Sequence, residues 1–107
     1  MKNIERRYIN WKKTGRNLKM LRMDNLILRR NVCYKLNYDK GECSGECEKC
    51  KYDMDTSISR AELAKIFFVT DSVITNWESG RTRVDLEAML FYCQIAGVTL
   101  EDIIVYD

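Results

Sequence analysis

Residues 59–80 read SRAELAKIFFVTDSVITNWESG and contain two short helix signals, one directly after the other. Ser59 starts a capping box, because its hydroxyl can accept a hydrogen bond from the amide of Glu62 while the Glu62 carboxylate reaches back. Thr70 is a second N-cap, and Gly80 stands where the end of a helix favours a left-handed residue. The apolar residues at helical spacing are Ala61, Leu63, Ala64, Ile66, Phe67, Ile74 and Trp77. The stretch therefore predicts two short helices joined by a tight turn, the layout of a helix-turn-helix unit.

Two more helix signals follow this pair. Asp85 is placed to cap a third helix, which Gly97 ends. The apolar stripe predicted to be buried on that helix consists of Leu86, Met89, Leu90 and Cys93. Thr99 opens a final short helix, whose predicted buried residues are Leu100, Ile103 and Ile104. Residues 58–107 are thus expected to be a run of short helices.

A further helix is expected before the pair. Thr14 can cap a helix that begins at Gly15, with Leu18 and Leu21 on its apolar side and Leu26 near its end. The basic residues that fill much of the remaining surface are Lys12, Lys13, Arg16, Lys19 and Arg22. The pattern predicts an amphipathic helix with a basic outer surface.

Charge is distributed unevenly along the 107 residues, although the net charge is only +2. The first 31 residues hold ten Lys or Arg against Glu5 and Asp24, whereas residues 58–107 hold four basic and eight acidic residues. A basic lead of this kind suits an anionic partner such as nucleic acid, and it equally suits a solvated basic face. Charge alone does not decide between the two.

Several classes of protein are disfavoured by what the sequence lacks. No apolar run is long enough to span a membrane, and the first 13 residues have no hydrophobic signal-peptide region, so we expect a cytoplasmic protein. The chain contains no His, no nucleophile-elbow motif and no phosphate-binding glycine loop. We therefore expect no enzyme activity and no catalytic residues.

The stretch ELAKIFFVTDSVITNWESGRTRVDLEAML at residues 62–90, followed by VTLEDII at 98–104, resembles the phage-repressor (Cro/cI, XRE-type) helix-turn-helix family. The lead GRNLKMLR at residues 15–22 is similar to the first helix of that family. The resemblance implies a five-helix, all-α domain over residues 1–107. It also implies a sequence-specific regulator of transcription, of bacterial or mobile-element type, that acts on double-stranded DNA as a homodimer. Its recognition helix, residues 71–79, would enter the major groove.

The resemblance also implies which side chains contact DNA. The residues expected to meet base edges or a thymine methyl are Asp71, Ser72, Val73, Thr75 and Asn76. The residues expected to hold phosphates are Arg16, Lys19, Arg60, Arg81 and Arg83. Ile74 and Trp77 are instead expected in the core, and Glu78 is expected to bond backbone or a neighbouring Arg. An acid at position 71 repels phosphate, and its simpler role is to stabilise the helix N-terminus.

Residues 26–57 depart from the family pattern, because family members pass from the first helix straight to the capping Ser. Residues 26–36 are rich in Ile, Leu, Val and Tyr and predict a strand, residues 37–41 a turn, and residues 51–55 a returning strand. We therefore expect a small, irregular or β-hairpin insertion. It is a candidate surface for a protein partner or for dimer formation.

Four cysteines lie in this insertion, at Cys33, Cys43, Cys47 and Cys50. Four closely spaced thiolates suit a tetrahedral structural zinc site, which would tie the start of the insertion to its end. Disulfides, free thiols and an iron–sulfur cluster are the alternatives. The fifth cysteine, Cys93, is expected to be a small core residue.

A second function is consistent with the same residues. A helix-turn-helix scaffold could serve as a protein-interaction module that docks on transcription or phage-defence machinery. Asp71 and the acidic second half of the chain favour that alternative, whereas the basic lead favours DNA.

Overall fold

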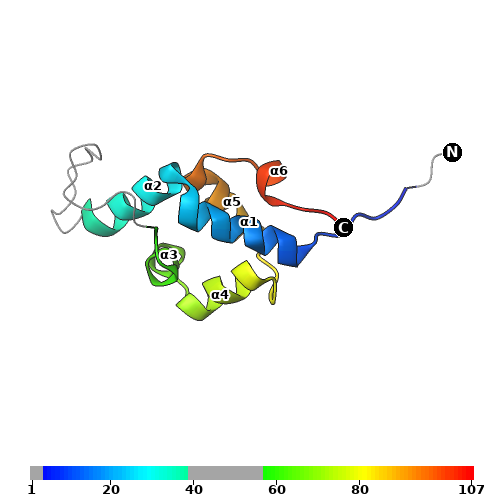
Figure 1. The fold of residues 1–107 in the computed structure, drawn as a ribbon, viewed down its shortest axis with the longest axis horizontal. Helices are drawn as coiled ribbons and strands as arrows, with labels where there is room; N and C mark the ends of the chain where they lie inside the picture. The colour runs from blue at the N-terminus through cyan, green and yellow to red at the C-terminus, as the bar shows by residue number, and fades with distance from the viewer. Residues whose placement is uncertain (1–3, 39–56) are drawn as a thin grey trace.

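The computed structural model describes residues 4–38 and 57–107, and in those ranges it is helical (Figure 1). Its helices are α1 Trp11–Asp24, α2 Leu26–Asn37, α3 Arg60–Phe67, α4 Asp71–Ser79, α5 Leu86–Ala96 and α6 Leu100–Ile103. The described ranges contain no strand, only an isolated antiparallel bridge between Ile9 and Tyr106. None of the described helices is both long enough and apolar enough to cross a membrane. The prediction of a mostly helical chain is confirmed.

Helix α1 begins earlier than predicted. Its cap is Asn10, whose side-chain oxygen accepts a hydrogen bond of 2.9 Å from the amide of Lys13. Thr14 is not a cap but a fully buried residue inside the helix, and its hydroxyl accepts a bond of 3.0 Å from the amide of Val105. The prediction of a start at Gly15 was wrong because the partner of Thr14 lies at the other end of the chain.

Residues 26–37 form helix α2, so the predicted strand over residues 26–36 was wrong. Asn25 caps this helix by accepting a bond of 2.8 Å from the amide of Leu28. Leu28 and Val32 lie one helical turn apart on the same side of α2, and both are completely buried. The helix packs against α3 and α5 and so belongs to the helical core. The predicted returning strand over residues 51–55 lies outside the described residues.

Helices α3 and α4 form the predicted pair. Both bonds of the Ser59 and Glu62 capping box are present, at 3.1 and 3.0 Å. Phe68 ends α3 in the left-handed conformation, with φ 57°, and its side chain is 88% exposed. Thr70 occupies the N-cap of α4 but makes no side-chain cap bond, and Gly80 ends α4 with φ 76°. The tight turn therefore rests on a left-handed residue that is not glycine.

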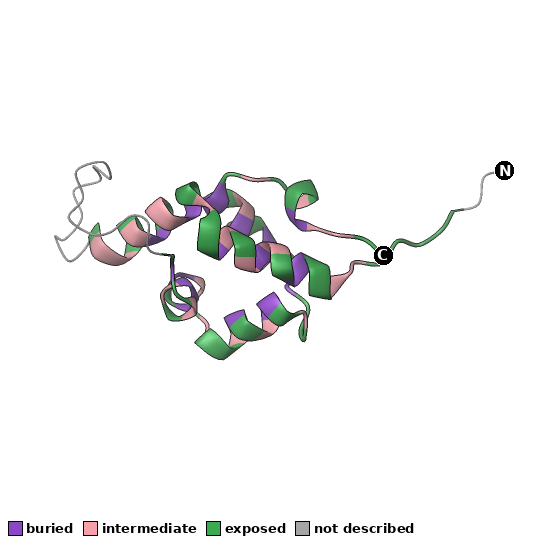
Figure 2. Cartoon of the chain, in the orientation of Figure 1, coloured by how far each residue is buried: buried purple, intermediate pink, exposed green. Residues whose placement is uncertain are grey.

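The core draws on every helix (Figure 2). Its fully or almost fully buried side chains include Leu18, Leu28, Leu63, Ile74, Tyr92 and Ile103. On α5 the predicted stripe was partly wrong, since Leu86 is 65% and Leu90 49% exposed while Met89 is buried. The side of α5 that is buried carries Met89, Tyr92, Ile95 and Ala96. The Tyr92 ring packs in an aromatic cluster, with its centre 4.7 Å from the centre of the Phe67 ring.

Helices α1 and α4 approach each other at two glycines. A Cβ atom on Gly15 would lie 2.3 Å from the carbonyl oxygen of Trp77, closer than any real contact. A Cβ atom on Gly80 would lie 2.5 Å from the Cα atom of Lys12. Backbone therefore packs directly on backbone, which fixes the position of α4 on the scaffold.

Candidate nucleic-acid interface

The exposed side of α4 carries the residues predicted to meet base edges. Asp71, Ser72 and Thr75 are exposed, while Val73 and Asn76 are half-buried. Ile74 and Trp77 are buried, as predicted for core residues. The candidate residues thus lie within the first six of the nine residues of α4 and border one face, and the N-terminal end of α4 is exposed (Figure 2).

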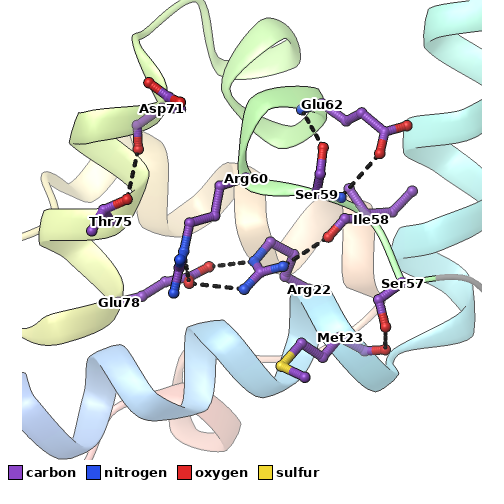
Figure 3. Close-up of polar contacts among 10 residues, drawn as sticks. All are labelled: Arg22, Met23, Ser57, Ile58, Ser59, Arg60, Glu62, Asp71, Thr75 and Glu78. Carbon is purple, nitrogen blue, oxygen red and sulfur yellow. Dashed lines mark hydrogen bonds and ion pairs between the residues drawn. The ribbon is translucent and has the colours of Figure 1, made fainter.

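Two of these side chains are already involved in the structure of α4 itself. The hydroxyl of Thr75 donates a bond of 3.1 Å to the carbonyl oxygen of Asp71, one turn earlier in the helix (Figure 3). Its oxygen lone pairs stay available to a donor on a base. The carboxylate of Asp71 lies in the first turn, where the helix dipole favours a negative charge. An amino group such as N4 of cytosine is the base substituent that this carboxylate can accept from.

Behind α4 lies a buried ion pair between Arg22 and Glu78. The guanidinium of Arg22 donates from Nε to Oε2 of Glu78 at 2.7 Å and from Nη2 to Oε1 at 3.1 Å. Its Nη1 atom donates to the carbonyl oxygen of Ile58 at 2.8 Å (Figure 3). Arg22 is only 8% exposed, so its predicted place on the basic outer surface was wrong. The pair ties α1 to α4 and to the start of α3.

A local signal for this pair was present in the sequence. Arg22 follows Leu18 by four residues, and Glu78 follows Ile74 by four, so each charge lies on the buried side of its helix. A buried charge needs a partner of opposite sign. What the sequence does not state is that the two helices cross at these turns.

Arg60 joins the same cluster. Its Nε atom donates to Oε1 of Glu78 at 3.0 Å, and the Glu78 side chain is only 2% exposed (Figure 3). The prediction that Glu78 bonds a neighbouring Arg is confirmed. The Arg60 side chain remains 40% exposed, so the predicted phosphate contact would fall to its remaining donors.

The other predicted phosphate-binding residues lie on α1 and in the loop after α4. Arg16 is exposed and Lys19 half-buried on α1, and Arg81 and Arg83 are exposed. Arg16 follows Gly15, which packs against the last turns of α4. The amide of Arg81 donates a bond of 3.0 Å to the carbonyl oxygen of Asn76, which holds the loop against the helix. The structure therefore places basic residues on two elements that border α4.

The predicted zinc ligands fall largely outside the described residues, which include Cys33 but not Cys43, Cys47 or Cys50. Cys33 is half-buried on α2, and its carbonyl oxygen accepts a bond of 2.8 Å from the side-chain amide of Asn37. Across residues 4–38 and 57–107 no group of three or more His, Cys, Asp or Glu is arranged to hold a metal. The four-cysteine site stays a prediction.

Cys93 and Tyr92 are neighbours on α5 that differ in exposure, since Cys93 is half-buried and Tyr92 is fully buried. Burial raises the pKa of the Cys93 thiol, in keeping with its packing against the core. Burial also raises the pKa of Tyr92, and the charge of Glu78 adds to the effect. Among the described residues the Tyr92 hydroxyl has no hydrogen-bond partner.

Comparison of the chain with protein-family models, with curated proteins and with solved structures gave no match.

Proposed function

We propose that this protein is a sequence-specific, double-stranded DNA-binding regulator of transcription, built on a repressor-like (XRE-type) helix-turn-helix scaffold. The observation that carries the proposal is the exposed N-terminal half of α4. It exposes Asp71, Ser72 and Thr75, with the half-buried Asn76 next to them, beside a partner helix that is capped at its N-terminus. These are the short polar side chains that read base edges in the major groove.

The dimensions of α4 suit this role. An α-helix with its side chains is about 10–12 Å across, and the major groove is about 12 Å wide. In helix-turn-helix proteins the second helix of the pair enters the groove while the first crosses the backbone. Asn76 would pair with adenine, and Val73 would meet a thymine methyl. Arg16, Lys19, Arg81 and Arg83 would supply the salt-dependent phosphate contacts.

The buried charges support accurate presentation of α4. Glu78 bonds Arg22 of α1 and Arg60 of α3, so one carboxylate links three helices. A reading surface must be held rigidly by the residues behind it, because small displacements cost base discrimination. We extend the proposal to a cytoplasmic homodimer that binds two half-sites about one DNA turn apart.

The first test of this function is binding to random-sequence duplex DNA over a range of salt concentrations. The proposal predicts binding at low salt that weakens linearly in a plot of log affinity against log salt. Absence of any shift of duplex DNA at low salt would overturn it.

An apolar hollow supports a second candidate function, a protein-interaction module. This hollow of about 460 Å³ lies between α2 and α5 and is lined by Tyr34, Tyr38 and Phe91, among others. The rings of Tyr34 and Tyr38 stack 4.7 Å apart, and both residues are exposed. Exposed aromatic residues are enriched at protein interfaces. The low-salt binding test separates the two candidates, since the module alone predicts no affinity for DNA.

A further inference from the structure

A second hollow, of about 230 Å³, lies where the N-terminal segment meets the loop after α4. Its lining residues are Arg6, Arg7, Tyr8, Ile9, Trp11 and Arg83. Three of these described residues carry a positive charge and none carries a negative one. The volume is below the roughly 300 Å³ at which small-molecule pockets begin, so it suits a phosphate group rather than a larger ligand.

The N-terminal wall of this hollow is held in place by the C-terminal end of the chain. The amide of Asn10 donates to the carbonyl oxygen of Val105 at 2.7 Å, and the amide of Asp107 donates to that of Tyr8 at 3.0 Å. Figure 1 shows the N-terminal segment leaving the helices beside the C-terminus. Residues 8–10 are therefore anchored, and Arg6 and Arg7 extend from a fixed base.

Two of the guanidinium groups lie over aromatic rings. The Arg7 guanidinium carbon is 3.8 Å from the centre of the Tyr106 ring, and that of Arg6 is 5.1 Å from the Tyr8 ring. A ring face attracts the cation without using its N–H donors, so those donors stay free for an anion. The ring contacts therefore orient the guanidinium groups of Arg6 and Arg7 at the hollow before any anion binds.

Among the described residues no carboxylate forms an ion pair with an arginine of this hollow, whereas Glu78 pairs with Arg22 and Arg60 elsewhere. The nearby Asp107 carboxylate accepts a bond of 2.9 Å from the side chain of Asn10 instead. Three guanidinium groups around one small space repel one another, and a bound anion would remove that repulsion.

We propose that this hollow, between the N-terminal segment and the loop after α4, binds a DNA backbone phosphate at the edge of the groove that α4 enters. The inference rests on the proposed function. Arg83 lies in the loop directly after α4, four residues beyond Ser79, so it stays beside α4 when that helix binds. The phosphates at the edge of the groove are the groups nearest to a basic side chain that borders a helix inside it. The paired N–H donors of an arginine guanidinium group match two phosphate oxygens in geometry as well as in charge.

The first experiment uses the two tryptophans of the chain and does not depend on DNA. Trp11 lines the hollow, whereas Trp77 is buried and its ring packs against Phe67 of α3 and Tyr92 of α5. The protein is labelled with 5-fluorotryptophan, Trp11→Phe assigns the two resonances, and inorganic pyrophosphate is titrated. The proposal predicts a saturable shift of the Trp11 resonance alone, which the double variant Arg7→Gln/Arg83→Gln loses. A Trp11 resonance that does not move, or that moves equally in the double variant, would overturn the proposal.

The second experiment measures the salt dependence of duplex DNA binding. The Arg7→Gln variant is compared with Lys35→Gln, which removes the same charge from an exposed lysine on α2, outside the hollow and outside the α3–α4 pair. Loss of one phosphate contact should lower the slope of log affinity against log salt by about 0.9, on cognate and random DNA alike. The control should keep the wild-type slope.

The two experiments separate failure of the hollow from failure of the function. Duplex binding with equal slopes in both variants would refute the role of the hollow and leave the proposed function intact. A Trp11 shift with pyrophosphate, but no duplex binding at low salt, would overturn the DNA proposal while the affinity of the hollow for phosphate stands.

Discussion

Replacing Glu78 by Gln is expected to destabilise the protein strongly, although the two side chains have almost the same shape. The variant leaves the Arg22 guanidinium buried at 8% exposure without a negative partner. Charges about 4 Å apart interact by about 4 kcal/mol at an effective dielectric constant of about 20. Removal of one partner of a buried pair costs about 3–5 kcal/mol in measured cases. We therefore expect a loss of about 4 kcal/mol in the free energy of unfolding.

The loss is large relative to the whole stability of a domain, which is about 5–15 kcal/mol. It is measured by urea denaturation, followed by circular dichroism and by tryptophan fluorescence. The control is Glu87→Gln, an exposed residue of α5, which should change stability by less than about 0.5 kcal/mol.

A double variant distinguishes a buried unpaired charge from a general loss of packing. Arg22→Met/Glu78→Gln removes both charges, so it should cost less than Glu78→Gln alone. Its remaining cost includes the Ile58 carbonyl oxygen, which loses the bond of 2.8 Å from Arg22. A Glu78→Gln variant within about 1 kcal/mol of the wild type, or a double variant less stable than the single one, would refute the reasoning.

Three further changes test the packing and the metal prediction. Gly15→Ala should lower the free energy of unfolding by about 1–3 kcal/mol in thermal melts, because the added Cβ atom would lie 2.3 Å from the Trp77 carbonyl oxygen. This clash outweighs the helix propensity of alanine, which favours the helix by about 1 kcal/mol over glycine. An unchanged or higher melting temperature would contradict this. Tyr92→Phe should leave stability unchanged or raise it by up to about 1 kcal/mol, because the buried hydroxyl has no hydrogen-bond partner among the described residues. A loss of more than about 1 kcal/mol on chemical denaturation would instead indicate that this hydroxyl is paired. Native mass spectrometry under reducing conditions should show one zinc ion per chain. A chelator should release this ion, and the Cys43→Ser/Cys47→Ser variant should lack it. A metal-free mass for the wild type would refute the zinc prediction.

The α3–α4 pair could be predicted because its signals are local. The Ser59 capping box, the Gly80 helix end and the apolar spacing of Ile74 and Trp77 each act within a few residues, and the structure confirms all of them. The exposure of Asp71 at the start of α4 follows from the same pattern.

The features that the sequence did not predict depend on distant partners. Thr14 has the chemistry of a cap, but the amide that it binds belongs to Val105. Residues 26–36 contain strand-forming residues, yet packing against α3 and α5 makes them a helix, because tertiary contacts outweigh a weak β-propensity. On α5 the apolar residues cover more than one face, so only the neighbouring helices decide that Tyr92 is buried and Leu90 is not.

The candidate site was likewise predicted only in part. The exposure of Asp71, Ser72 and Thr75 on α4 was predictable because a helix displays its side chains in order, while their contact with DNA stays a prediction. The bond of Arg60 to the buried Glu78 and the hollow around Arg83 were not predicted, since both form where elements far apart in sequence come together.

The most direct measurement of the central claim, that α4 reads DNA, is selection of binding sites from randomised duplex DNA, followed by affinity measurement on the selected and random sequences. We predict that the wild type enriches a defined site. Asn76→Ala should lose about 1–3 kcal/mol of discrimination at one base pair, whereas Lys19→Ala should weaken binding to all sequences alike. No enrichment at low salt, or equal losses on selected and random DNA for both variants, would contradict the claim.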